Sequence, residues 1–191
     1  MGSTDRDINS RISLTWTAFG KLKTLLTARN LNISLKIRLF NAACISILLY
    51  GCESWVLKEK QMKKLDVFVR SCYRIMLNIK QADSRITNEE LYRMADGQVP
   101  VSETIRVRQL QFTGHCLRMG EDEPSNIYCL FASNNSSSRK QGAPTRRYID
   151  KISTYLGSDR QIKYSAEEIT KYAKDKSFWK KHVAAPKKPD R

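Results

Sequence analysis

The sequence is poor in the residues that interrupt helices, with 8 Gly and 5 Pro among 191 residues. A fold built from many short strands and tight turns needs more of both, because Gly and Pro supply the backbone angles of most turns. Leu, Ile, Lys and Arg are abundant instead. The composition therefore predicts an all-α fold, which we expect to be a helical bundle with a small basic helical appendage at its C-terminal end.

The chain also lacks the side-chain patterns of a catalytic site. It has two His and none of the P-loop, GxGxxG, GxSxG or HExxH motifs. Its densest acidic group, residues 121–123, falls in an expected surface turn, whereas a two-metal site needs carboxylates that converge. We expect no enzyme activity, no cofactor and no small-molecule substrate. A cryptic nuclease that uses His115 or the acids at 121–123 is a minor alternative.

The five cysteines form no CxxC pair. Cys44, Cys72 and Cys116 fall on apolar stripes, where a free Cys acts as a small buried hydrophobe. His115, Cys116 and Cys129 offer three zinc ligands without a fourth, and a structural zinc site needs a closed set. We therefore predict free thiols, no metal, and an intracellular location in the nucleus or cytoplasm, where thiols stay reduced.

Long hydrophobic runs are absent as well. The longest apolar stretch, residues 39–50, is about half of the ~20 residues that a membrane-spanning helix requires. Charged residues follow the first four positions directly, which differs from a signal peptide. We expect no membrane partner, and we interpret residues 39–50 as part of a buried core helix.

Positive charge is what the chain has in excess: 34 Lys+Arg against 19 Asp+Glu give a net charge of +15. Phosphate polyanions are the usual partners of such a surplus, because each neutralised phosphate releases condensed counterions. An anionic membrane surface and an acidic protein are the other partner classes. We expect binding to the phosphate backbone of RNA or DNA, with no sequence-specific readout.

Apolar residues at spacings of three and four predict amphipathic helices along most of the chain. The expected helices cover residues 5–29, 34–49, 58–78, 87–94, 101–119, 144–156 and 165–183. Thr87 and Ser165 each open a capping box, and Ser34 is the expected N-cap of the second helix. Gly114, inside its helix, predicts the close approach of another helix or backbone.

A polar run at residues 133–142 (SNNSSSRKQG) is the expected linker. It separates a helical domain at residues 5–132 from a basic helical appendage at residues 143–185, and residues 186–191 form an expected disordered tail. Residues 139–191 hold 15 Lys+Arg against 6 Asp+Glu. We therefore expect this C-terminal part to carry most of the net charge.

Three groups of side chains are the predicted phosphate contacts. One broad arc of the helix at 58–78 carries Lys60, Lys63, Lys64, Arg70 and Arg74. One face of the helix at 101–119 carries Arg108, His115 and Arg118. The appendage adds Arg146, Arg147, Lys180 and Lys181. Tyr73 and Tyr148 are the predicted aromatic side chains for stacking on unpaired bases.

Short motifs also follow one another in a distinctive order. They are DINSRISLTWTAFGKLK at 7–23, ISILLYGCESW at 45–55, LDVFVRSCYRIMLNI at 65–79, ITNEELYRMAD at 86–96, RQLQFTGHCLRM at 108–119, GAPTRRYID at 142–150 and FWKKHV at 178–183. Together they resemble the region that follows the catalytic palm in non-LTR (LINE-type) retrotransposon reverse transcriptases. Its signatures include LLYG-x-E-x-W, N-E-E-L and G-H-x-x-R-M.

The resemblance implies a thumb and C-terminal region that helps to hold template–primer. The polymerase Asp residues and the endonuclease of that family lie in other domains, which agrees with a non-catalytic chain. The motif positions are Tyr50, Gly51, Glu53, Trp55, Gly114, His115, Arg118 and Met119. Phe112, Ala143 and Tyr148 depart from the residues usual in the family.

Two questions stay open on the sequence. RNA, DNA and a hybrid duplex are all compatible with backbone binding. The alternative function is a protein-interaction module that docks on a missing palm domain, or on a host protein, through an apolar helical face.

Overall fold

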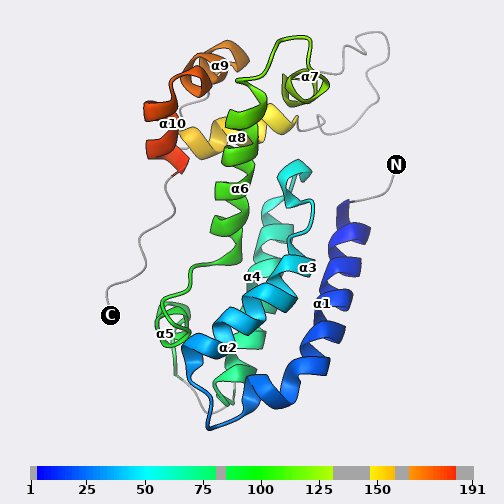
Figure 1. Ribbon diagram of the computed structural model, residues 1–191, viewed down its shortest axis with the longest axis vertical. Helices are drawn as coiled ribbons and strands as arrows, with labels where there is room; N and C mark the ends of the chain where they lie inside the picture. Colours follow the sequence, from blue (N-terminus) through cyan, green and yellow to red (C-terminus); the bar gives the residue numbers. More distant parts are fainter. Residues whose placement is uncertain (1–3, 81–84, 131–146, 158–163, 184–191) are drawn as a thin grey trace. The chain divides into compact units, whose positions relative to one another are not determined.

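The computed structural model describes residues 4–80, 85–130, 147–157 and 164–183. Across these ranges the chain forms helices and no strand, which confirms the all-α class (Figure 1). The helices are α1 (Thr4–Thr27), α2 (Ile33–Phe40), α3 (Ser46–Leu48), α4 (Glu59–Met76), α5 (Asn88–Met94), α6 (Val101–Cys116), α7 (Pro124–Leu130), α8 (Tyr148–Leu156), α9 (Ala166–Lys174) and α10 (Lys176–Val183). A π-helical turn, η1 (Asn41–Ile45), joins α2 to α3, and a 3-10 turn, η2 (Cys52–Ser54), precedes α4.

Two compact units make up the chain, and they divide inside α6, between Ile105 and Arg106. Unit 1 contains α1 to α5 and the start of α6, whereas unit 2 contains Cys52–Val56, the rest of α6 and α7 to α10. The expected linker at 133–142 lies outside the described residues. Helices α8, α9 and α10 share a hydrophobic core with α6 and α7, so the compact units divide at a different place from the predicted domains.

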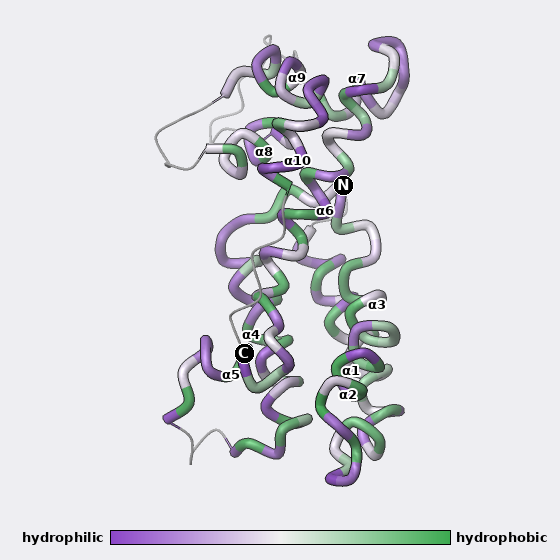
Figure 2. Tube along the Cα trace, turned by 60° about the vertical axis from the view of Figure 1, so that its left-hand side comes forward, coloured by the Kyte–Doolittle hydropathy of each residue, from purple (hydrophilic) through white to green (hydrophobic). Residues whose placement is uncertain are grey.

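Unit 1 is built around α1, which contacts α2, η1, α3 and α4. Figure 2 shows hydrophobic positions recurring along these helices between hydrophilic ones, as amphipathic helices require. Aromatic side chains fill the interior edge to face: ring centroids lie 6.0 Å apart for Phe19–Phe40 and 5.6 Å apart for Phe40–Tyr73. Tyr73 is 3% exposed, so the prediction that it stacks on bases is wrong.

The second helix differs from its prediction at its N-cap and in its interior. Its N-cap is Asn32, whose Oδ1 accepts from the Ser34 amide at 2.9 Å, while the Ser34 hydroxyl donates to Asp96 at 3.0 Å. The predicted helix at 34–49 is interrupted by η1, where the Ser46 amide reaches the Asn41 carbonyl. A π turn of this kind accommodates an extra residue within a helix.

Polar side chains fix the ends of the other helices of unit 1. The predicted Thr87 cap of α5 is confirmed, with its hydroxyl accepting from the Glu90 amide at 3.2 Å. Asp66 of α4 accepts from the Ser102 amide at 3.0 Å and from the Ser102 hydroxyl at 2.8 Å, and thereby caps α6. The buried Lys36 ammonium donates to the Met76 carbonyl at 3.3 Å, at the C-terminal end of α4.

Unit 2 is organised by the contact between Gly114 and Trp179. A Cβ on Gly114 would overlap the indole ring, and the indole Nε1 donates to the Leu110 carbonyl at 3.0 Å. The close approach predicted at Gly114 is therefore confirmed. The predicted Ser165 capping box of α9 is confirmed as well, because Ser165 and Glu168 each bond the other's backbone amide.

Tyr148 begins α8 and is 6% exposed. Its hydroxyl lies 3.1 Å from the Thr113 hydroxyl, in the core of unit 2. The prediction that Tyr148 stacks on unpaired bases is therefore wrong, because its ring and hydroxyl are both engaged inside the unit.

All five cysteines are free and buried, which confirms the burial predicted for Cys44, Cys72 and Cys116. Burial raises the pKa of Cys52 to about 11 and the pKa values of Cys72 and Cys129 to about 12. Among the residues that the structure describes, no three His, Cys, Asp or Glu side chains are grouped to hold a metal ion. None of the helices in those ranges is long and apolar enough to cross a bilayer.

Candidate nucleic-acid interface

The outward side of α4 carries the first group of predicted phosphate contacts. Lys60 and Lys63 are exposed, and neither has a hydrogen bond or an ion pair to another described residue. Arg74 lies on the same arc, about 21 Å along the helix from Lys60 at ~1.5 Å per residue. Val67, between them on this arc, is 53% exposed, which confirms that the arc faces solvent.

Two other members of this group are held by neutral partners. The Lys64 ammonium donates to Asn9 Oδ1 on α1 at 2.6 Å, and Arg70 donates to the Tyr92 hydroxyl on α5 at 3.3 Å. Burial raises the pKa of Tyr92, while the charges of Arg70 and Arg74 oppose that rise. These contacts position the basic side chains without neutralising their charge.

The described part of unit 1 carries the larger charge surplus. It contains 16 Lys+Arg against 8 Asp+Glu, whereas the described part of unit 2 contains 10 against 8. Two of its ion pairs, Arg11 with Asp7 and Arg93 with Glu90, join neighbours on one helix. The C-terminal charge expected from the sequence falls largely at positions outside the described ranges, among them Arg146.

The predicted contacts on α6 separate into different environments. Arg108 is half-buried near Cys52, where its charge opposes the burial that raises the pKa of the thiol. His115 is exposed. Arg118 is exposed too, but its Nη1 donates to the Ala173 carbonyl at 2.9 Å, at the C-terminal end of α9. A cation there also interacts favourably with the helix dipole.

A basic groove of about 390 Å³ lies between α6 and α10. Its lining residues are Gln111, Arg118, Lys176, Trp179, Lys180 and Val183. The groove brings the predicted Arg118 and Lys180 together and adds Lys176, which the sequence analysis missed. The i, i+4 spacing of Lys176 and Lys180 is the signal that could have identified it. Since the lining holds three cations and no acid, the groove suits an anionic ligand.

The remaining predicted contacts lie outside this groove. Arg147 forms a bidentate ion pair with Asp150, in which Nε and Nη2 donate to the two carboxylate oxygens at 3.1 and 3.0 Å. This pair raises the pKa of the guanidinium. Its charge is therefore already compensated. Lys181 is exposed, and its position in the helical repeat of α10 differs from that of the groove residues Lys176 and Lys180.

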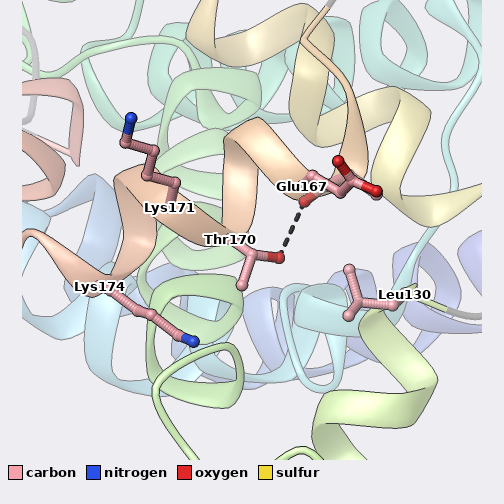
Figure 3. A pocket seen from close by; sticks show the side chains of 6 residues that line it. Leu130, Glu167, Thr170, Lys171 and Lys174 are labelled. Atoms are coloured by element: carbon pink, nitrogen blue, oxygen red, sulfur yellow. Dashed lines mark hydrogen bonds between the residues drawn. The ribbon is translucent and has the colours of Figure 1, made fainter.

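A second groove runs between α7 and α9 (Figure 3). It consists of adjoining cavities of about 440 and 340 Å³ that share Leu130, Thr170 and Lys174. Figure 3 shows the ammonium groups of Lys171 and Lys174 pointing in different directions, and Lys174 pairs with Glu121 at 3.9 Å. Its charges are mixed and partly paired, so this groove suits a polyanion less well than the α6/α10 groove.

Three motif positions lie near residue 50 in different settings. Gly51 adopts a left-handed conformation with φ +73°, which favours glycine. The Arg11 guanidinium lies 4.8 Å from the centre of the exposed Tyr50 ring. Trp55 is buried in unit 2, where its carbonyl accepts from Gln109 Nε2 at 2.7 Å.

Comparisons with protein-family models, with curated proteins and with solved structures find no match to this chain. The resemblance to a reverse-transcriptase thumb therefore stands on the ordered sequence motifs. The geometric support for a function comes from the α4 arc, defined by Lys60, Lys63, Lys64, Arg70 and Arg74, and from the α6/α10 groove.

Proposed function

We propose that this chain binds the phosphate backbone of nucleic acid and catalyses no reaction on it. The α4 arc carries the proposal, because Lys60 and Lys63 are exposed cations without acidic partners among the described residues. The ~21 Å between Lys60 and Arg74 corresponds to about six nucleotides, since a duplex strand advances ~3.4 Å per nucleotide. A row of cations on that scale can contact several successive phosphates.

The ordered sequence motifs support template–primer as the specific ligand. In a reverse transcriptase the thumb region binds the duplex, while the separate palm domain catalyses polymerisation. A basic chain that binds nucleic acid without catalysis would correspond to the thumb. RNA, DNA and hybrid duplexes share the phosphate backbone that the α4 arc would contact. We therefore expect binding to all three, with little dependence on base sequence.

The test compares two double variants that remove the same charge from unit 1. Lys60→Ala/Lys63→Ala removes cations from the α4 arc, and Lys21→Ala/Lys23→Ala removes exposed cations from α1. Fluorescence anisotropy with a labelled 20-base-pair duplex should show about tenfold weaker binding for the α4 variant. Its salt dependence should also be shallower by about two phosphate contacts.

The α1 variant should bind nearly as tightly as the wild type if the α4 arc is the contact surface. Equal losses in both variants would show that net charge alone drives binding. An unchanged affinity in the α4 variant would contradict the proposal.

A protein-interaction module is the second candidate, and the α7/α9 groove favours it. Leu117, Ile127 and Leu130 give this groove an apolar lining, and Ile127 is 50% exposed. Exposed apolar surface of this kind commonly marks a protein contact. Light scattering after size exclusion should then show self-association without nucleic acid, and Ile127→Lys should abolish it.

A further inference from the structure

A column of aromatic rings runs along α9 and α10. Tyr172 stacks on Phe178 with centroids 4.5 Å apart and ring planes 21° apart, and Phe178 stacks on His182 at 4.3 Å and 30°. Tyr164 meets Tyr172 edge-on at 5.4 Å. All four rings are half-buried, so the column lies at the surface of unit 2.

The most deeply buried rings of unit 1, Phe19, Phe40 and Tyr73, are at most 3% exposed and meet edge to face, as interior rings commonly do. Unit 1 also has a nearly parallel pair, Trp16 on Phe19 at 5.5 Å and 6°, and this pair reaches the surface at Trp16. The Tyr172–Phe178–His182 column is likewise nearly parallel, and it ends at His182. Among the described residues, Phe178 is the ring that stacks on His182, and His182 itself is partly exposed. A planar ring placed on the outer face of His182 would extend the stack at this end.

Two basic residues lie near the same end of the column. Lys181 is exposed and adjacent to His182 in the sequence. Arg106 donates from Nη1 to the His182 carbonyl at 3.2 Å, which brings a second cation to the end of α10. Proteins that bind single strands combine these two features, since aromatic faces stack on bases while cations hold the backbone.

We propose that an unpaired base of a single-stranded nucleic acid stacks on His182, at the end of the Tyr172–Phe178–His182 column, while Lys181 contacts an adjoining phosphate. This inference rests on the proposed backbone binding and adds a separate contact for unpaired bases. The stacking tolerates any base, because every base presents a π-face. The ring faces do not read the 2′-hydroxyl, so RNA and DNA strands should both bind.

The experiment uses the full chain and single strands that contain 2-aminopurine, whose emission falls when it stacks. Wild-type protein should quench this emission in DNA and in RNA strands. His182→Ala should lose the quenching and bind about fivefold more weakly, as expected for the loss of one stacked base. His182→Phe keeps a flat ring and should restore both. Tyr128→Ala, which removes an exposed aromatic ring of the same unit, should behave as the wild type.

A strand with abasic sites gives an independent measurement. The wild type should bind the abasic strand about as weakly as His182→Ala binds the normal strand. His182→Ala should bind the abasic strand and the normal strand with the same affinity. Retained quenching and affinity in His182→Ala would overturn the stacking site alone. The stacking site would also be overturned if the wild type bound duplexes but did not bind single strands. If the wild type binds no nucleic acid at all, both the stacking site and the proposed function are overturned.

Discussion

Gly114 lies against the indole of Trp179, which leaves no space for a side chain at position 114. A Cβ would overlap several atoms of the indole ring, which itself is held by its bond to the Leu110 carbonyl. We predict that Gly114→Ala lowers the free energy of unfolding by about 2 kcal/mol, because overpacking outweighs the gain in helix propensity. Denaturant titration followed by tryptophan fluorescence measures the change.

Gly20 provides the matched control, since it also lies within a helix but has no atom within 4 Å of a built Cβ. Gly20→Ala should raise the free energy of unfolding by roughly 0.5–1 kcal/mol. Similar effects of the two substitutions would contradict the tight packing at Gly114.

The buried thiols predict a loss of stability in alkali. Burial raises the pKa of Cys72 to about 12, whereas a thiol in the unfolded chain ionises near pH 9. Between these values the folded state binds more protons than the unfolded state, so stability is full below pH 9 and falls as pH rises toward 12. Burial raises the pKa of Tyr148 in the same direction.

Unfolding free energies at pH 8, 9.5 and 10.5 test this dependence. The wild type should lose stability across the series, and Cys72→Ala should show a shallower decline. A decline that is identical in the two proteins would assign the pH effect to other groups.

Sequence reasoning at single residues succeeded where the cause is local. Gly114 was predictable because a glycine inside a helix is costly without a packing reason. The burial of Tyr73 was not predictable in the same way. Periodicity places Tyr73 at the border of an apolar stripe, and its burial is decided by contacts with the rings of Phe40 and Tyr92. The contact of Arg118 with Ala173 likewise depends on a helix 55 residues away in the sequence.

At the scale of elements, α9 owes its start to a reciprocal cap. The Ser165 hydroxyl accepts from the Glu168 amide at 3.2 Å, and Glu168 accepts from the Ser165 amide at 2.7 Å. We predict that Ser165→Ala costs about 1 kcal/mol and speeds amide hydrogen exchange in the first turn of α9. Thr170→Ala is the control, since its hydroxyl only bonds the Ala166 carbonyl of the same helix. Equal effects would contradict a capping role for Ser165.

Helix existence was more predictable than helix detail. The capping boxes identified the starts of α5 and α9, whereas η1 within residues 34–49 has no counterpart in the periodicity. Helix α7 was missed because seven residues are too few for a clear apolar repeat. Pro124 at its first position was the available signal, since Pro is favoured there.

At the scale of the molecule, sequence composition and packing divide the chain into parts at different positions. The Ser/Asn-rich run at 133–142 marks a change in composition, whereas the compact units divide within α6. Gln109 explains part of the difference, because its side chain donates to the carbonyls of Cys52 and Trp55 at 2.8 and 2.7 Å. A segment from the first third of the chain thereby belongs to unit 2, which a linear search for linkers cannot detect.

The net charge of +15 gives a prediction for the whole chain. If about six phosphates are neutralised, the logarithm of the binding constant should fall with the logarithm of salt concentration at a slope of about −4 to −5. A rise from 50 to 200 mM salt should then weaken binding by roughly 250- to 1,000-fold. Docking through the apolar lining of the α7/α9 groove should depend less on salt, because the charges of this groove are mixed and partly paired and apolar contacts release few ions. A titration with one duplex at four salt concentrations separates the two functions: a slope near zero would contradict backbone binding.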